Sequence, residues 1–214
     1  MTTEDVLNQS QPRYKHSRIG HLPFSKSKGK DDLDFAMANF VGQQVVVSEK
    51  MDGENTTIYS DGFCHARSID SSYHPSRGKA KALAAAIAPY LPDNWRMCAE
   101  NMGATHTIEY RKNIPTLLVH SLWKENTMLS YEHGADFVSQ LDHLSIQMAP
   151  LLYKGTWDEN AIRSSWKEKG AYGRSEGFVV RLSAEIEIAD FPDSVAKYVS
   201  DSFQVGQVHW SKRF

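Results

Sequence analysis

Runs of β-branched and aromatic residues predict a series of strands along the chain. Pro115 precedes the most apolar of these runs, at 116–123, which is consistent with a buried strand. A turn is expected near Gly103, between two of the strands. Strands are predicted at 41–47, 56–59, 62–67, 95–100, 107–110, 116–123 and 177–182.

Helical patterns lie between these strands. The alanine-rich segment 78–90 has no helix breaker before Pro89, and apolar residues recur at near-helical spacing in 131–152, where Pro150 ends the pattern. Asp158 is a suitable cap for a third helix that runs to Lys169. A last amphipathic stretch covers 191–210. Helices inserted between strands favour an α+β fold with mostly antiparallel sheets.

The stretch Ser48 to Asn55 joins the first two predicted strands. Its Asp52-Gly53 pair indicates a turn, because glycine accepts the positive φ that such a turn requires. Lys50 then stands at the end of a strand with Asp52 beside it. A lysine amine becomes a nucleophile when its pKa is lowered, although an exposed hairpin with a solvated lysine explains this stretch equally well.

Composition favours one soluble domain. The 214 residues are 41% hydrophobic and 23% charged, which is ordinary for a globular protein, and we expect 1–12 to be a loose N-terminal tail. The longest apolar run, 82–88, is too short to span a membrane, and no signal peptide is visible. The only cysteines, Cys64 and Cys98, lack metal-ligand spacing. We therefore expect a reduced, cytoplasmic setting and no membrane contact.

Positive charge is concentrated near the N-terminus, although the net charge is −2. The segment 11–30 has no acidic residue, and aromatic Tyr14 and Phe24 are interleaved with its cations, Arg13, Lys15, Arg18, Lys26, Lys28 and Lys30. Such a segment is either a solvated arm or a contact for a polynucleotide backbone. The second interpretation predicts a salt-dependent affinity for nucleic acid.

Five further polar patterns follow in order: His65-Ala66-Arg67-Ser68, Cys98-Ala99-Glu100-Asn101-Met102-Gly103, Leu118-Val119-His120-Ser121, Ser175-Glu176-Gly177-Phe178-Val179-Val180-Arg181 and Val195-Ala196-Lys197-Tyr198-Val199. Each has a structural explanation when taken alone. Glu100 and Glu176 suit the ends of strands, His120 suits a core position, and Lys197 suits the surface of a helix. Their order along the chain is what carries the functional interpretation.

Together these patterns resemble the nucleotidyltransferase motifs of covalent ligases and capping enzymes, most closely ATP-dependent RNA ligases of the phage and bacterial nick-sealing type. The most specific elements are Lys-x-Asp-Gly at 50–53, Glu-Asn-Met-Gly at 100–103 and Glu-Gly-x-Val-Val-Arg at 176–181. The similarity extends from about Arg13 to Trp210. It implies a single adenylyltransferase domain over 1–214, ATP-grasp-like and without an OB-fold domain.

The resemblance implies that Lys50 attacks the α-phosphate of ATP and holds AMP covalently. The AMP then passes to an RNA 5′-phosphate, and a 3′-hydroxyl closes the strand. Mg²⁺, or Mn²⁺ in its place, is expected at Asp52, Glu100 and Glu176. The residues expected to bind the nucleotide are Glu49, Lys50, Asp52, Gly53, Asn55, Arg67, Glu100, His120, Glu176 and Lys197.

Individual roles follow from the same resemblance. Glu49 is expected against the adenine edge, Lys197 at the α-phosphate, and Arg67 at a phosphate or ribose. Glu100 has the ribose hydroxyls as an alternative to the metal. His120 occupies the position where the family stacks an aromatic ring on the base.

Three features depart from the family pattern. His120 replaces phenylalanine or tyrosine, so we expect weaker stacking that depends on pH. Val199 stands where some relatives have a second lysine, and the sequence stops shortly after Trp210. Two alternatives remain: a module that binds RNA ends or nucleotides with little sealing activity, and a DNA-joining enzyme that acts with a partner. The expected partner is RNA with 5′-phosphate and 3′-hydroxyl ends, and a separate repair or RNA-binding protein is allowed.

Overall fold

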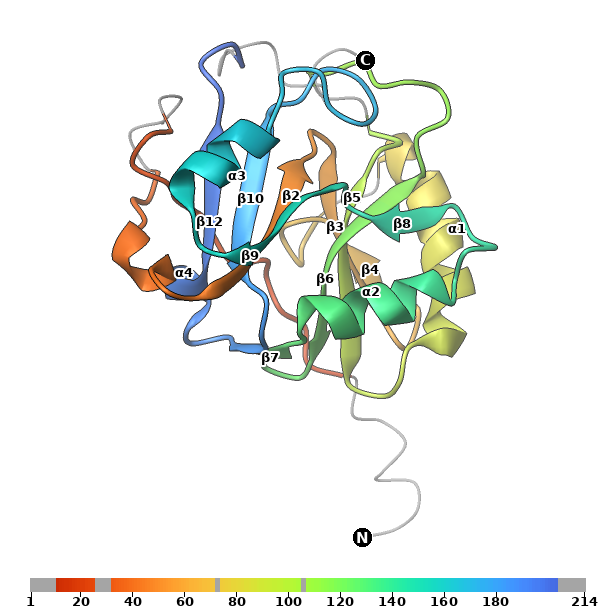
Figure 1. Cartoon of the computed structure of the whole chain (residues 1–214). Helices are drawn as coiled ribbons and strands as arrows, with labels where there is room; N and C mark the ends of the chain where they lie inside the picture. Colours follow the sequence, from red (N-terminus) through yellow and green to blue (C-terminus); the bar gives the residue numbers. More distant parts are fainter. Residues whose placement is uncertain (1–10, 26–31, 72–73, 105–106, 204–214) are drawn as a thin grey trace, which may run out of the picture.

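Two β-sheets form the centre of the protein (Figure 1), as seen in a computed structural model that describes residues 11–25, 32–71, 74–104 and 107–203. The first sheet has the order β1-β12-β10-β2-β9. Its strands are β1 (Gly20–His21), β2 (Gln44–Lys50), β9 (Leu151–Thr156), β10 (Gly177–Leu182) and β12 (Val195–Val199). All its pairs are antiparallel except β1 with β12.

The second sheet has the order β11-β7-β6-β5-β3-β4, and β8 pairs in parallel with β6. Its other pairs are antiparallel. The strands are β3 (Glu54–Tyr59), β4 (Cys64–His65), β5 (Trp95–Asn101), β6 (Leu117–Lys124), β7 (Thr127–Met128), β8 (Ile146–Met148) and β11 (Ile186–Glu187). The mostly antiparallel α+β fold expected from the sequence is confirmed.

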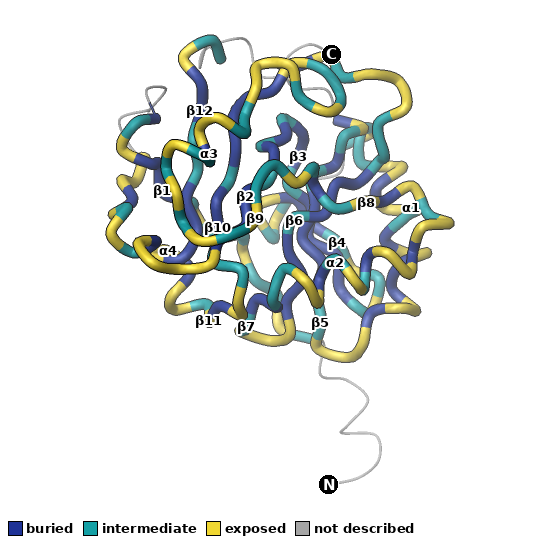
Figure 2. Tube along the Cα trace, in the orientation of Figure 1, coloured by how far each residue is buried: buried dark blue, intermediate teal, exposed yellow. Residues whose placement is uncertain are grey.

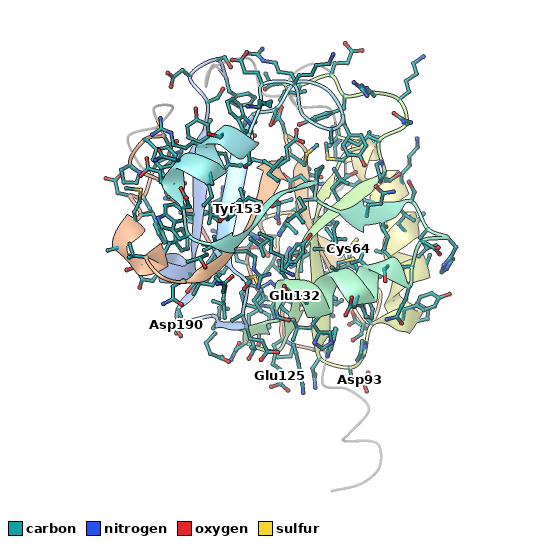
Figure 3. The ribbon with its side chains drawn as sticks, in the orientation of Figure 1. Cys64, Asp93, Glu125, Glu132, Tyr153 and Asp190 are labelled. Atoms are coloured by element: carbon teal, nitrogen blue, oxygen red, sulfur yellow. The ribbon has the colours of Figure 1, made fainter. Side chains whose placement is uncertain are left out.

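Within the described ranges, four α-helices accompany the sheets: α1 (Gly78–Ile87), α2 (Tyr131–Ser139), α3 (Glu159–Ser165) and α4 (Phe191–Ser194). Short 3₁₀ helices lie at Met37–Phe40, Pro75–Arg77 and Ala88–Tyr90. The Ser130 and Asp158 side chains cap α2 and α3 by accepting backbone N–H groups from His133 and Ala161. Glu132 of α2, labelled in Figure 3, pairs with Lys154 of β9 at 2.5 Å. This surface ion pair links the helix that covers the second sheet to an edge strand of the first sheet.

Alternation along the strands separates an apolar face from a polar one in each sheet. In β2, Val45 and Val47 enter a core with Phe40 and Ile162, whereas Ser48 and Lys50 line a cavity. The second sheet buries its other face against α1 and α2. Figure 2 shows the resulting buried strands and the more exposed helices. The polar faces of the two sheets therefore meet at the cavity.

Several expected elements are wrong. The segment 131–152 is not one helix, because α2 ends at Ser139 and the alternating apolar residues at 144, 146 and 148 lead into β8. No strand forms at 107–110, since the amides of Thr107 and Ile108 donate to the Asp52 carboxylate instead of to a sheet. The helix after Asp158 ends at Ser165 rather than Lys169.

The end of the described chain also differs from expectation. The stretch beginning at Phe191 forms the short α4 and then β12, whose β-branched residues favour a strand. Lys197 is therefore on a strand and not on a helix surface. His209 and Trp210, part of the family resemblance, lie outside the described residues.

Gly53 lies in a connection between the two sheets and not in a hairpin turn, because β2 and β3 belong to different sheets. Among the described glycines it is not one with positive φ, so the conformational reason given for it above is wrong. Glycine is required at position 53 because neighbouring atoms lie too close for a side chain. A Cβ at Gly53 would lie 2.8 Å from the Asn101 carbonyl oxygen and 3.0 Å from Glu100 Cγ.

Within the part of the chain described here, no helix is long and apolar enough to cross a membrane.

Candidate active site

A cavity of about 220 Å³ lies between the polar faces of the two sheets. Strands β2, β10 and β12 form one wall, and β3, β5 and β6 form the other. Seven of the residues predicted from the sequence line it: Glu49, Lys50, Asn55, Arg67, Glu100, His120 and Lys197. Residues from motifs far apart in the sequence thus share one enclosed space.

Lys50 and Glu176 form a close ion pair beside this cavity. Lys50 Nζ donates to Glu176 Oε2 at 2.6 Å, and the two side chains are only 24% and 7% exposed. The contact follows from the sheet, because β2 and β10 are antiparallel neighbours with Lys50 opposite Gly177. The acid that precedes β10 therefore lies next to the lysine that ends β2.

Burial and charge act in opposite directions on these groups. Burial alone would lower the pKa of Lys50, but Glu176, with Glu100 and Asp52 further away, raises it overall. The pKa of Glu100 rises to about 8, mainly because the carboxyl is buried; attraction to Lys50 opposes the rise, and repulsion from Glu176 and Asp52 adds to it. Burial also raises the pKa of Glu176. This side of the cavity is an acidic cluster with one cation.

Three of the predicted residues, Asp52, Gly53 and Glu176, do not line the cavity themselves. The Asp52 carboxylate accepts the backbone N–H groups of Thr107 and Ile108 at 2.8 and 2.9 Å, and its own N–H donates to the Tyr110 hydroxyl at 2.8 Å. No group of three His, Cys, Asp or Glu side chains in the described ranges is arranged to hold a metal ion. Asp52 therefore anchors the segment 107–110 to the end of β2.

Glu49 is 2% exposed and lies under the connection before β10. Its Oε2 accepts the Ala171 N–H at 3.0 Å, while Oε1 is buried without a hydrogen-bond partner among the residues described. Burial raises the pKa of this carboxyl, and the hydrogen bonds from Ala171 and Ser175 oppose the rise. A Cβ at Gly170 would overlap the Glu49 carboxylate, so the connection depends on glycine at that position.

His120 is held by hydrogen bonds through both ring nitrogens. Its Nε2 lies 3.2 Å from Asn55 Nδ2, and its Nδ1 lies 3.2 Å from Ser121 Oγ. Burial, together with repulsion from His16 and Arg181, lowers the pKa of His120 to about 3. The ring is therefore neutral near pH 7, which removes the reason to expect pH-dependent stacking from it.

Arg67 and Lys197 bring positive charge to the cavity, and both also line a second, polar cavity of about 140 Å³. Burial lowers the pKa of Lys197, while Asp32 and Glu176 raise it. These two residues are the lining cations that the sequence identified besides Lys50.

Two lining residues, His16 and Arg181, were not assigned roles from the sequence. The His16 ring contacts the His120 ring edge-on, with centroids 5.3 Å apart. Arg181 is 7% exposed and donates to the carbonyl oxygens of Leu129, Leu182 and Ala184. Arg181 ends the Glu-Gly-x-Val-Val-Arg motif at 176–181, and His16 lies in the basic segment 11–30, so the sequence offered a signal for both.

The basic N-terminal segment is partly committed to the protein itself. Arg13 pairs with Asp61, and its guanidinium lies 4.4 Å from the centroids of both the Tyr59 and Phe63 rings. Gln11, which falls in the segment 1–12 expected to be a loose tail, donates to the Trp95 carbonyl at 3.0 Å and is therefore held against the protein. Residues 1–10 lie outside the described residues. Lys15 and Arg18 are exposed. The remaining cations, Lys26, Lys28 and Lys30, lie outside the described residues.

Comparison with known proteins identifies one family by sequence and related structures by fold. The sequence model for RNA ligase matches residues 43–199. No curated protein sequence matches the chain. The fold is similar to structures of Naegleria gruberi RNA ligase: a ligand-free mutant (TM-score 0.55, 14% identity, 78% of this chain), a mutant with ATP and Mn (0.56, 14%, 90%) and a complex with PPi (0.54, 14%, 90%). The matches cover 52%, 62% and 62% of those chains, respectively, so this chain spans about half to three fifths of their length.

Proposed function

The chain belongs to the RNA ligase family, and on that premise we propose that it joins RNA ends with ATP through a covalent AMP intermediate on Lys50. The observation that carries the proposal is the position of Lys50. Its side chain lines the cavity between the two sheets and contacts the acid of a second family motif, Glu176, at 2.6 Å. A lysine enclosed in this way suits a nucleophile better than a solvated surface residue.

Three displacements at phosphorus make up the proposed reaction. The neutral Lys50 amine attacks the α-phosphorus of ATP and loses a proton to solvent, the bond to the β-phosphate oxygen breaks, and pyrophosphate leaves. An RNA 5′-phosphate oxygen then attacks the same phosphorus, the P–N bond breaks, and Lys50 Nζ takes back the electron pair and a proton. Finally, a 3′-hydroxyl attacks the RNA 5′-phosphorus, loses its proton and releases AMP.

The cavity walls support a nucleotide in this role. Arg67 and Lys197 offer positive charge to non-bridging phosphate oxygens, which is how phosphoryl transfer is stabilised. Glu49 Oε1 and Asn55 Oδ1 are buried acceptors with no partner in the described part of the protein. A nucleoside carries N–H and O–H donors that can satisfy such oxygens. We propose Glu49 for the base edge, as the family resemblance implies.

A divalent cation, Mg²⁺ or Mn²⁺, fits the acidic side of the cavity, and Naegleria gruberi RNA ligase has been solved with ATP and Mn. When bound, such an ion supplies positive charge that opposes the raised pKa of Lys50. Glu100 and Glu176 are the residues that would hold it, and Asp52 adds negative charge from outside the cavity. Two carboxylates are enough for such an ion, because Mg²⁺ keeps several water molecules as ligands and does not need three protein side chains.

The proposal extends to the architecture. Both sheets contribute walls to one cavity, which supports a single ATP-grasp-like adenylyltransferase unit over the described residues. Cys64 and Cys98 are free thiols, which supports the cytoplasm as the proposed compartment.

Sealing of a nicked RNA duplex tests the proposed function. The nicked strand carries a labelled 5′-phosphate, and a matched nick in DNA is tested in parallel. We expect ATP-dependent formation of the joined RNA strand, and none with K50A. Binding of ATP and RNA without any joined product would instead support the binding-module alternative. Sealing of the DNA nick alone would support the DNA-joining alternative.

A further inference from the structure

We propose that His120 is a positioning residue: it holds the Asn55 side-chain amide so that Oδ1 is presented to a ribose hydroxyl of the ligand. This inference rests on the proposed function for the identity of the ligand. It replaces the stacking role that the family resemblance implies for position 120. The substrate group involved is a hydroxyl, either of the adenylate ribose or of the RNA strand that supplies the 3′ end.

The position of His120 results from a β-bulge. Cys98 pairs with Ser121 and the next residue, Ala99, pairs with Val119, so His120 is the extra residue on β6. A bulge of this kind redirects a side chain and is common beside active sites. Here it lets both His120 and Ser121 line the cavity, although neighbours on a regular strand face opposite sides.

The hydrogen-bond partners of Ser121 favour a proton on Nδ1 of His120. The indole N–H of Trp123 can only donate, and it donates to Ser121 Oγ at 3.1 Å. The Ser121 hydroxyl also bonds to Cys98, which lies directly opposite it in the sheet. If the hydroxyl donates to Cys98, its remaining lone pair accepts the Nδ1–H of His120 at 3.2 Å. Nε2 is then an acceptor.

The acceptor at Nε2 sets the orientation of Asn55. The Asn55 Nδ2 amino group donates to Nε2 at 3.2 Å, which turns Oδ1 the other way. Oδ1 is buried, lacks a hydrogen-bond partner among the described residues, and belongs to a residue that lines the cavity. A buried acceptor of this kind is costly unless a ligand donates to it, and a ribose hydroxyl is such a donor.

A phenyl ring at position 120 separates the two roles. Phenylalanine keeps a face for base stacking but has no acceptor for Asn55 Nδ2. Glutamine has no ring, but its side-chain oxygen can replace Nε2 as acceptor. Stacking therefore predicts that H120F is active and H120Q is impaired, whereas positioning predicts the reverse.

The first test needs no activity. Two-bond ¹H–¹⁵N correlation spectra of the full chain report the His120 tautomer directly, with H120F used to assign the signals. We expect protonated Nδ1 and unprotonated Nε2 at pH 7, and a shift toward protonated Nε2 in N55A. A wild-type ring protonated at Nε2, or one that N55A leaves unchanged, would overturn the proposal, even in a protein that shows no ligase activity.

The second test is a double-mutant cycle on the rates of Lys50 adenylation and of sealing pre-adenylated RNA. We expect N55A and H120F each to slow one of these steps by about tenfold or more, because each leaves a polar group unpaired. The H120F/N55A double variant should match N55A within about twofold, and H120Q should stay within about threefold of wild type. Exposed His143 provides the control, H143F, which should match wild type.

The affected step identifies the hydroxyl. If the variants adenylate slowly and replacing ATP by 2′- or 3′-deoxy-ATP slows them no further, the hydroxyl belongs to the adenylate ribose. If only sealing is slowed, the hydroxyl belongs to the RNA strand. Additive effects of N55A and H120F, or full activity of H120F, would overturn the inference. If wild-type protein forms neither product, the proposed function fails while the tautomer result still decides the role of His120.

Discussion

Lys50 Nζ lies 2.6 Å from Glu176 Oε2, although the two residues are 126 positions apart in the chain. The contact is produced by the antiparallel pairing of β2 and β10, which carries the two motifs to the same end of the sheet. Both side chains are largely buried, so each compensates the charge of the other. The lysine proposed as the nucleophile and an acid from a separate motif are thereby held side by side.

Replacement of Glu176 by glutamine tests the catalytic value of this acid. E176Q keeps the shape of the side chain but removes its charge, so we expect Lys50 adenylation to slow by on the order of a hundredfold. Single-turnover AMP transfer, measured across a Mg²⁺ and Mn²⁺ titration, checks this. The exposed Glu168 supplies the control variant E168Q, which should react like the parent. Normal adenylation by E176Q at every metal concentration would limit Glu176 to a structural role.

Asp52 should hold the segment 107–110 in place. D52A removes the acceptor for two backbone N–H groups, so we expect faster hydrogen exchange at Thr107 and Ile108. D52N retains an acceptor oxygen and should show slower exchange there than D52A. Unchanged exchange in D52A would contradict the anchoring role. If the charge also serves the metal, D52N will lose adenylation despite an intact segment.

Close packing around Gly53 predicts a stability difference between two glycine variants. G53A places a Cβ 2.8 Å from the Asn101 carbonyl, so we expect a loss of about 1–3 kcal/mol in unfolding free energy. G78A is the matched control, because a Cβ there has nothing within 4 Å and Gly78 begins α1. That variant should be neutral or slightly more stable. Urea unfolding measures both, and equal effects would contradict the packing argument.

His16 should make the protein less stable in mild acid. Its pKa is lowered from 6.5 to about 4, mainly by burial, with repulsion from Arg67 and Arg96 adding to the effect and the hydrogen bond to the Ser17 carbonyl opposing it. Between these two pH values the unfolded chain binds a proton that the folded protein does not, so stability falls as the pH drops through this window. H16Q cannot titrate there. Between pH 7 and pH 5, the melting temperature of H16Q should therefore fall less than that of wild type. We expect the two decreases to differ by at least about 2 °C. Parallel melting curves would contradict the assignment.

Local sequence patterns predicted the parts of the fold that depend on local chemistry. The β-branched run before Lys50 and the apolar run after Pro115 form strands where expected, and Asp158 caps a helix. The segment 131–152 was misread because apolar residues at near-helical spacing are followed by others at alternate positions. The spacing of apolar residues over one long window does not distinguish a helix followed by a strand from a single helix.

The candidate site shows a similar division. Residue types and their order identified seven of the residues that line the cavity, including Lys50, Glu100 and Lys197. Contacts made through loops and irregular backbone could not be predicted from the sequence, because they depend on how distant segments are placed in the fold. Asp52 bonds to the amides of a segment more than fifty residues away, and His120 reaches Asn55 through a bulge that no local pattern indicates.

The most direct test of the central claim is the intact mass of the protein after incubation with ATP and Mg²⁺ or Mn²⁺, followed by peptide mapping. We predict a single AMP adduct located on Lys50. K50A and K50R should form none, because alanine lacks the amine and a guanidinium stays protonated. An AMP adduct that persists in K50A, or wild-type protein that acquires no adduct with either metal, would contradict the assignment of Lys50 as the nucleophile.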